Sequence, residues 1–116
     1  MKKIRDIERL KHIRDAIDYI LLHTHAIDFE TFEAHELLPF AVVKHLEIIG
    51  EAANQLEEET RQQQPQIEWG KIINARHIFV HVYHDTDWAI VWTIVTEHLA
   101  ELKEAVVKMI ETEEQN

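Results

Sequence analysis

The chain has 116 residues, a length that suits one domain with its own hydrophobic core. With two glycines, two prolines and 46% hydrophobic residues, the composition favours long helices over a turn-rich β fold. Cysteine is absent, which excludes disulfides, thiolate zinc sites and cysteine nucleophiles. The formal net charge of −10 argues against a protein that coats nucleic acid through a broad basic surface.

The start of the chain is charged and amphipathic, and it does not resemble a secretion signal. No apolar run approaches the roughly 20 residues that a membrane-spanning helix needs. We therefore expect a cytoplasmic protein without a membrane span.

Apolar residues recur every three or four positions between residues 2 and 24, which predicts a first long helix. Asp28 is a candidate N-cap for a short helix, in which Phe29 and Phe32 would face inward. Pro39 suits the first turn of a second long helix, or a break just before it. The apolar stripe of that helix is expected at Val42, Leu46, Ile49, Ala53 and Leu56.

Gly50 falls in the middle of this second long helix, where glycine costs about 1 kcal/mol relative to alanine. We therefore expect another backbone to approach it closely. Residues 57–68 are polar and without periodicity, and they are the one plausible long connection. The next helix should begin near Trp69 and run to about Tyr83.

The last predicted helix follows a turn at Asp85, Thr86 and Asp87, which also supplies its N-cap. Its apolar residues alternate in steps of four and three, a heptad-like seam that suits a bundle core or a dimer interface. The seam consists of Trp88, Trp92, Val95, Leu99, Leu102, Val106 and Met109. We find no internal repeat, and we predict a single helical domain over residues 1–116.

The unusual stretch of the chain places one arginine, three histidines and a tyrosine on one predicted helix. Arg76 and Tyr83 share one stripe of this helix, and the three histidines share a second stripe. These histidines are His77, His81 and His84. Arg76 and His81 lie about 140° apart around the axis, so a single straight helix does not aim both at one atom. Two copies of the helix facing each other would relax this constraint.

Three interpretations of this stretch remain open on spacing alone. RNA can be cleaved by attack of its 2′-OH, which needs a base, an acid and positive charge on the phosphate. Arg76, His81 and Tyr83 would supply these parts. Alternatively, His77, His81 and His84 would bind a transition metal from one helical face. Finally, the same rings could bond to backbone or to nearby carboxylates, a structural role.

The other six histidines are scattered, and we interpret them as surface or packing residues. They are His12, His23, His25, His35, His45 and His98.

Several blocks of the sequence resemble the HepT-like proteins of the HEPN superfamily. Residues 41–42 and 46–53, with Gly50, Glu51 and Ala52, resemble the signature of their second helix. Residues 67–73 resemble the segment that leads into their active helix. Arg76-x4-His81-x-Tyr83 matches their Arg-x4-His-x-Tyr motif, and residues 87–92 match the opening of their last helix. The resemblance covers nearly the whole chain.

This resemblance implies an all-α, antiparallel bundle of four to five helices that forms a homodimer, with both Arg/His sets in a shared cleft. It further implies a metal-independent endoribonuclease that acts as the toxin of a toxin–antitoxin pair. Arg76 would hold phosphate and His81 would move protons. His77, where the family commonly has asparagine, would bind RNA or orient a neighbour. The antitoxin would be a minimal nucleotidyltransferase (MNT) that attaches AMP to Tyr83.

Two alternatives stand beside the RNase toxin. One is a non-catalytic dimeric partner of a minimal nucleotidyltransferase. The other is a helical metal-binding protein that uses His77, His81 and His84.

Overall fold

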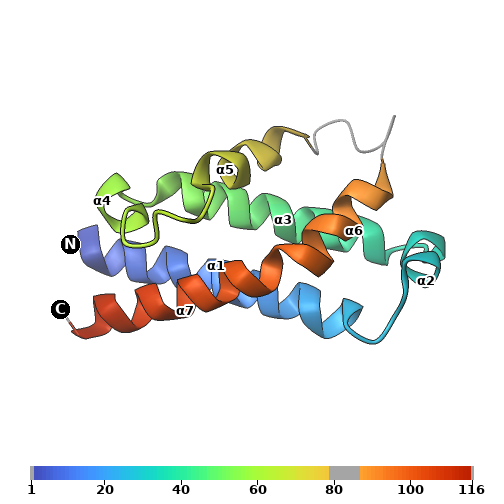
Figure 1. Cartoon of the computed structure of the whole chain (residues 1–116), viewed down its shortest axis with the longest axis horizontal. Helices are drawn as coiled ribbons and strands as arrows, with labels where there is room; N and C mark the ends of the chain where they lie inside the picture. The colour runs from blue at the N-terminus through green and yellow to red at the C-terminus, as the bar shows by residue number, and fades with distance from the viewer. Residues whose placement is uncertain (1, 79–86, 116) are drawn as a thin grey trace.

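A computed structural model describes residues 2–78 and 87–115 of the chain, and within these ranges it contains helices and no strand. The helices are α1 (Lys2–Thr24), α2 (Phe29–Ala34), α3 (Leu38–Gln55), α4 (Glu58–Arg61), α5 (Trp69–Ile78), α6 (Trp88–Glu97) and α7 (Leu99–Gln115). α1, α3, α5 and the α6–α7 pair run back and forth along one long axis (Figure 1), with α1 packed on α3 and α7 and with α5 packed on α3. The predicted all-α antiparallel bundle is therefore confirmed.

The core is formed by the inward faces of α1, α3 and α7, with contributions from the shorter helices. The heptad-like seam lies in this core, since the last five of its seven residues are buried within the single chain. These residues are Val95, Leu99, Leu102, Val106 and Met109. The spacing allowed either a bundle core or a dimer interface, and in the structure the seam forms part of the bundle core.

α2 begins where the sequence predicted a cap. The Asp28 carboxylate accepts a hydrogen bond from the backbone N–H of Thr31 at 2.8 Å, and this bond holds the pKa of Asp28 below its ordinary value of 3.8. Phe32 is fully buried, with its ring centroid 4.9 Å from that of Trp92 and edge-on to Trp88 at 6.3 Å. The short helix thus places an aromatic anchor against α6.

α3 begins at Leu38 with Pro39 in its first turn, as predicted. Its N-cap residue is Leu37, which makes no side-chain cap bond. Two N–H groups at the helix start, those of Leu37 at 3.0 Å and Leu38 at 2.9 Å, are instead accepted by Nδ1 of His35. In α3, Nδ1 of His45 lies 2.7 Å from the carbonyl oxygen of Ala41. These histidines of the scattered set have local structural roles.

The connection at residues 57–68 is more ordered than the sequence predicted, since it contains the single turn α4. The carboxylate of Asp6 in α1 is buried and accepts the backbone N–H of Glu57 and the hydroxyl of Thr60. In a second hydrogen bond to a distant helix, Nε2 of Gln63 donates to Oε1 of Glu113 in α7 at 2.8 Å. The acceptors lie about 50 residues away along the chain, so local propensity does not reveal this turn.

The last predicted helix is interrupted, which corrects the expectation of one continuous helix from Trp88 to Met109. α6 ends at Glu97, and His98 has φ −121° and ψ −28°, outside helical geometry. The seam spacing continues across this break because Val95 and Leu99 both remain in the core. Asp87 is the N-cap of α6, as predicted, and accepts from Ala89 N–H at 3.0 Å.

In the described parts of the chain, no helix combines the length and apolar character that crossing a membrane requires. α5 begins at Trp69, as predicted. The expected continuation of α5 over 79–83 and the turn residues Asp85 and Thr86 lie outside the described residues.

Candidate active site

The candidate site lies on α5, where the backbone of this helix comes very close to α3 at Gly50. A Cβ added to Gly50 would lie 2.9 Å from the carbonyl oxygen of Ile72 and 3.2 Å from the Cβ of Arg76. The close backbone approach that a mid-helix glycine predicted is therefore present, and the backbone that approaches is α5. Gly50 thus sets how closely the motif arginine lies to α3.

Arg76 is half-buried at this contact, and its guanidinium is incompletely paired. Its Nε lies 3.8 Å from Oε2 of Glu51, and the side chains are 24% and 57% exposed. Nη1 of Arg76 is buried and has no hydrogen-bond partner among the residues that the structure describes. Buried donors are usually satisfied, so the guanidinium of Arg76 has hydrogen-bonding capacity that the described part of the chain does not use.

A hollow of about 430 Å³ opens beside this arginine, between α3 and α5. It is lined by Lys44, Glu47, Ile48, Glu51, Arg76 and His77. Within the hollow, Nζ of Lys44 lies 3.9 Å from Oε2 of Glu47, an exposed pair that contributes little to stability. Two cationic side chains and one imidazole therefore share a concave surface, and two carboxylates flank them.

His77 is exposed and lies with Arg76 at this hollow, which brings together two of the four predicted site residues. The others, His81 and Tyr83, lie outside the described residues, as does His84 of the alternative metal set. Among residues 2–78 and 87–115, no cluster of three or more histidine or acidic side chains has the arrangement of a metal site. His77 is the one member of the alternative metal set that the structure describes.

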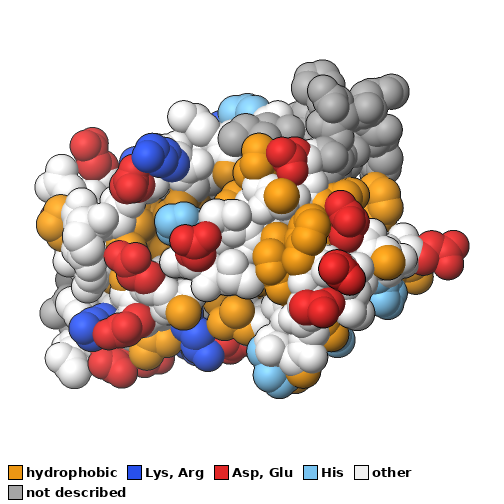
Figure 2. Space-filling model, turned by 45° about the vertical axis from the view of Figure 1, so that its right-hand side comes forward, with side chains coloured by type: hydrophobic (Ala, Val, Ile, Leu, Met, Phe, Trp, Pro, Cys, Tyr) orange, Lys and Arg blue, Asp and Glu red, His pale blue; other side chains and the backbone are white. Residues whose placement is uncertain are grey.

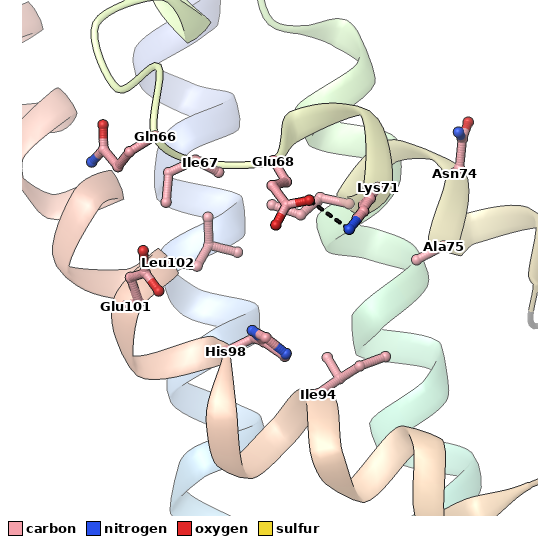
Figure 3. Close-up of a pocket in the computed structure, with 11 residues that line it drawn as sticks. Gln66, Ile67, Glu68, Lys71, Asn74, Ala75, Ile94, His98, Glu101 and Leu102 are labelled. Carbon is pink, nitrogen blue, oxygen red and sulfur yellow. Dashed lines mark ion pairs between the residues drawn. The ribbon is translucent and has the colours of Figure 1, made fainter.

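A second hollow, of about 460 Å³, lies between α5 and the α6–α7 pair (Figure 3). Apolar side chains of Ile67, Ile72, Ala75, Ile94 and Leu102 contribute to its lining. At its rim Nζ of Lys71 lies 2.6 Å from Oε2 of Glu68, a hydrogen-bonded pair that lowers the pKa of Glu68 and raises that of Lys71. Glu101 adds a further negative charge, so this hollow is a poorer place for phosphate than the one at Arg76.

Sequence reasoning singled out Arg76 and His77 but missed the side chains of α3 that face them. Glu51 belongs to the block that resembles the family's second helix, but the sequence alone gives it no role, and no sequence pattern distinguishes Lys44. The available signal was Gly50, since the residues next to a close helix–helix contact are well placed to meet the partner helix.

The fold and the site together define a small helical bundle with a half-paired arginine in a hollow between two packed helices. Residues 13–109 match the family described as Ribonuclease HepT-like, and the chain belongs to this family. No solved structure gives a match.

Named relatives are similar over most of their length. One is a Thermococcus cleftensis protein named "probable ribonuclease HepT", 34% identical over 81% of this chain and 86% of its own. Another is a Methanocaldococcus jannaschii protein named "putative RNase", 30% identical over 88% of this chain and 94% of its own. A third, also named "putative RNase", comes from Caldanaerobacter subterraneus and is 30% identical over 90% of this chain and 93% of its own.

Proposed function

We propose that this protein is a metal-independent endoribonuclease that acts as the toxin of a HepT/MNT-type toxin–antitoxin pair. The observation that carries the proposal is Arg76, which lines the hollow between α3 and α5 and whose buried Nη1 lacks a hydrogen-bond partner among the described residues. A planar guanidinium matches the oxygens of a phosphodiester through two parallel hydrogen bonds. The names of the relatives support RNA as the substrate.

In the proposed reaction Arg76 binds the scissile phosphate and balances the charge that develops on it. His81 takes the proton of the 2′-hydroxyl while the 2′-oxygen bonds to phosphorus. The bond to the 5′-oxygen breaks, and a protonated group returns a proton to that oxygen. The products are a 2′,3′-cyclic phosphate and a free 5′-hydroxyl, and no metal enters the balance. His77 is the proposed auxiliary group that contacts RNA.

The partner assignments belong to the same proposal. The whole chain, residues 1–116, would act as one HepT-like domain in the cytoplasm. Two copies would face each other, so that the Arg/His sets of both contribute to one cleft. A minimal nucleotidyltransferase would attach AMP to Tyr83, and the added bulk and negative charge would occupy the position of RNA phosphate near Arg76. Acidic side chains are spread over the face in Figure 2, and such a surface suits a basic partner.

The decisive experiment incubates the purified protein with RNA in the presence of excess chelator and analyses the product ends. We expect the wild type to cleave RNA and leave 2′,3′-cyclic phosphates. Neither Arg76→Ala nor His81→Ala should cleave. The matched control is Arg14→Ala, because Arg14 pairs with its neighbour Asp15 on α1, away from the hollow. A protein that binds a nucleotidyltransferase tightly but leaves RNA intact would instead be the non-catalytic partner.

The modification is tested separately by mass. Co-expression with the cognate nucleotidyltransferase should raise the intact mass by one or more AMP units in the wild type and not in Tyr83→Phe. A full increase in the variant would remove Tyr83 as the acceptor.

A further inference from the structure

The carboxylate of Glu51 lies between an amide on its own helix and the motif arginine on the next. Its Oε1 accepts a hydrogen bond from Nε2 of Gln55 at 3.2 Å, one turn further along α3. Its Oε2 faces Nε of Arg76 at 3.8 Å. The two oxygens therefore have different partners, so Gln55 fixes the direction in which Glu51 meets the arginine.

The contact engages the guanidinium of Arg76 at one corner only. Arginine carries five N–H donors in a fixed fork, and Glu51 lies at the Nε corner. Nη1 remains unpartnered among the described residues. At 3.8 Å the pair is an ion pair without a formed hydrogen bond. Such a contact can restrict the rotation of the arginine without using the donors that phosphate needs.

The other carboxylate of the hollow has a different role. Glu47 pairs with Lys44 three residues before it on the same helix. Glu51 is the carboxylate that pairs with Arg76 across the α3–α5 contact. It is also next to Gly50, whose missing side chain allows α5 to come this close.

We propose that Glu51, held by Gln55, is a positioning residue that aims Arg76 at the scissile phosphate. The proposal rests on the proposed RNase function and deepens it. Because Glu51 is 57% exposed, solvent screens its repulsion of a bound phosphate. Its benefit is the orientation of Arg76, and a small error in orientation costs reaction rate more than binding.

Kinetics of Glu51→Ala separate positioning from general stability. We expect kcat to fall by about 10-fold to 100-fold while KM stays the same or falls, since a negative charge next to the phosphate is lost. Glu51→Gln keeps an acceptor at the same place and should recover part of kcat. The charge-matched control is Glu59→Ala, an exposed glutamate on α4, with kcat and KM unchanged.

A second measurement tests the contact without RNA cleavage. The Nε–Hε resonance of Arg76 in ¹⁵N NMR should change its chemical shift in Glu51→Ala, and by less in Gln55→Ala, because the carboxylate beside Nε is removed or displaced. Adding inorganic phosphate should shift this resonance in the wild type. If Glu51→Ala does not fold, Glu51→Gln and Gln55→Ala carry the test.

The two proposals fail in different ways. If the wild type cleaves no RNA but the Arg76 resonance depends on Glu51, the proposed RNase function is wrong, while the contact between Glu51 and Arg76 is supported. If RNA is cleaved and Glu51→Ala retains wild-type kcat and the Arg76 signal, the positioning role is overturned. A rise of KM with unchanged kcat would also overturn it, because Glu51 would then act on binding alone.

Discussion

Gly50 and Arg76 meet across the α3–α5 contact with no room for another carbon atom. A Cβ at position 50 would lie 3.2 Å from the Cβ of Arg76, and only 2.9 Å from the backbone oxygen of Ile72. The second neighbour is backbone, which cannot move aside as the end of a flexible side chain can. The position of the motif arginine is therefore fixed by main-chain packing.

Gly50→Ala should displace α5 and lower both stability and activity. Overpacking of this kind costs about 1–3 kcal/mol, even though alanine is the better helix former. The free energy of unfolding, measured by urea denaturation, should fall by that amount, and RNA cleavage should fall with it. The control is Gly70→Ala on α5, where an added Cβ meets nothing within 4 Å. Equal stability of the two variants would contradict the close contact.

Phe32→Ala should be among the most destabilising substitutions in the short helix α2. The ring is fully buried against Trp92 and Trp88, so its removal leaves a cavity that costs about 3–5 kcal/mol. Thermal unfolding followed by tryptophan fluorescence checks both the loss and the changed environment. Leu22→Ala is the exposed control, 67% accessible, and should change stability by about 0.5 kcal/mol or less.

The Asp28 cap should make part of the stability of α2 depend on pH. Hydrogen bonds from Thr31 lower the pKa of Asp28 below 3.8, so the carboxylate is favoured in the folded state. Its contribution is complete above the unfolded pKa and is lost as the pH falls through the lower folded value. Asparagine is an uncharged N-cap of similar quality, so Asp28→Asn is the matched variant. The stability difference between wild type and Asp28→Asn should change as the pH falls below 3.8, and a constant difference would contradict the cap.

Thr60→Val should weaken the attachment of α4 to α1. Valine cannot donate to the buried Asp6 carboxylate, which then lacks one of its partners. The expected cost is about 1–3 kcal/mol in the free energy of unfolding. A double-mutant cycle with Asp6→Ala measures the coupling, and additive effects would show that the two side chains do not interact. Thr96→Val on α6 is the control, because that hydroxyl is exposed and bonds within its own helix.

The sequence predicted the elements whose signals are local. The periodicity of α1, Pro39 in the first turn of α3, and the caps at Asp28 and Asp87 all depend on neighbours within a few residues. The sequence does not predict α4, because the carboxylate that accepts the N–H of its N-cap residue Glu57 belongs to Asp6, 51 residues away along the chain. The sequence also does not predict the break at His98, since the 4-3 spacing of buried residues continues across it unchanged.

For the site, the motif predicted which side chains matter, whereas the partners required the fold. Arg76 and His77 were predicted from their order along one helix, and both line the hollow. Glu51 comes to Arg76 through the packing of α3 on α5, which single-sequence reasoning indicated only through Gly50. The expected roles of His81 and Tyr83 concern residues outside the described ranges, and they stay predictions.

The connection between α3 and α5 is tied to opposite ends of the chain. Asp6, in the second turn of α1, holds α4, and Glu113, in the last turn of α7, receives the amide of Gln63. Figure 1 shows both chain ends at the same end of the bundle as α4. Fraying of α1 would thus leave the backbone amide of Glu57 without its acceptor, and fraying of α7 would do the same to the side-chain amide of Gln63. The ends and the middle of the chain should exchange amide hydrogens as one cooperative unit.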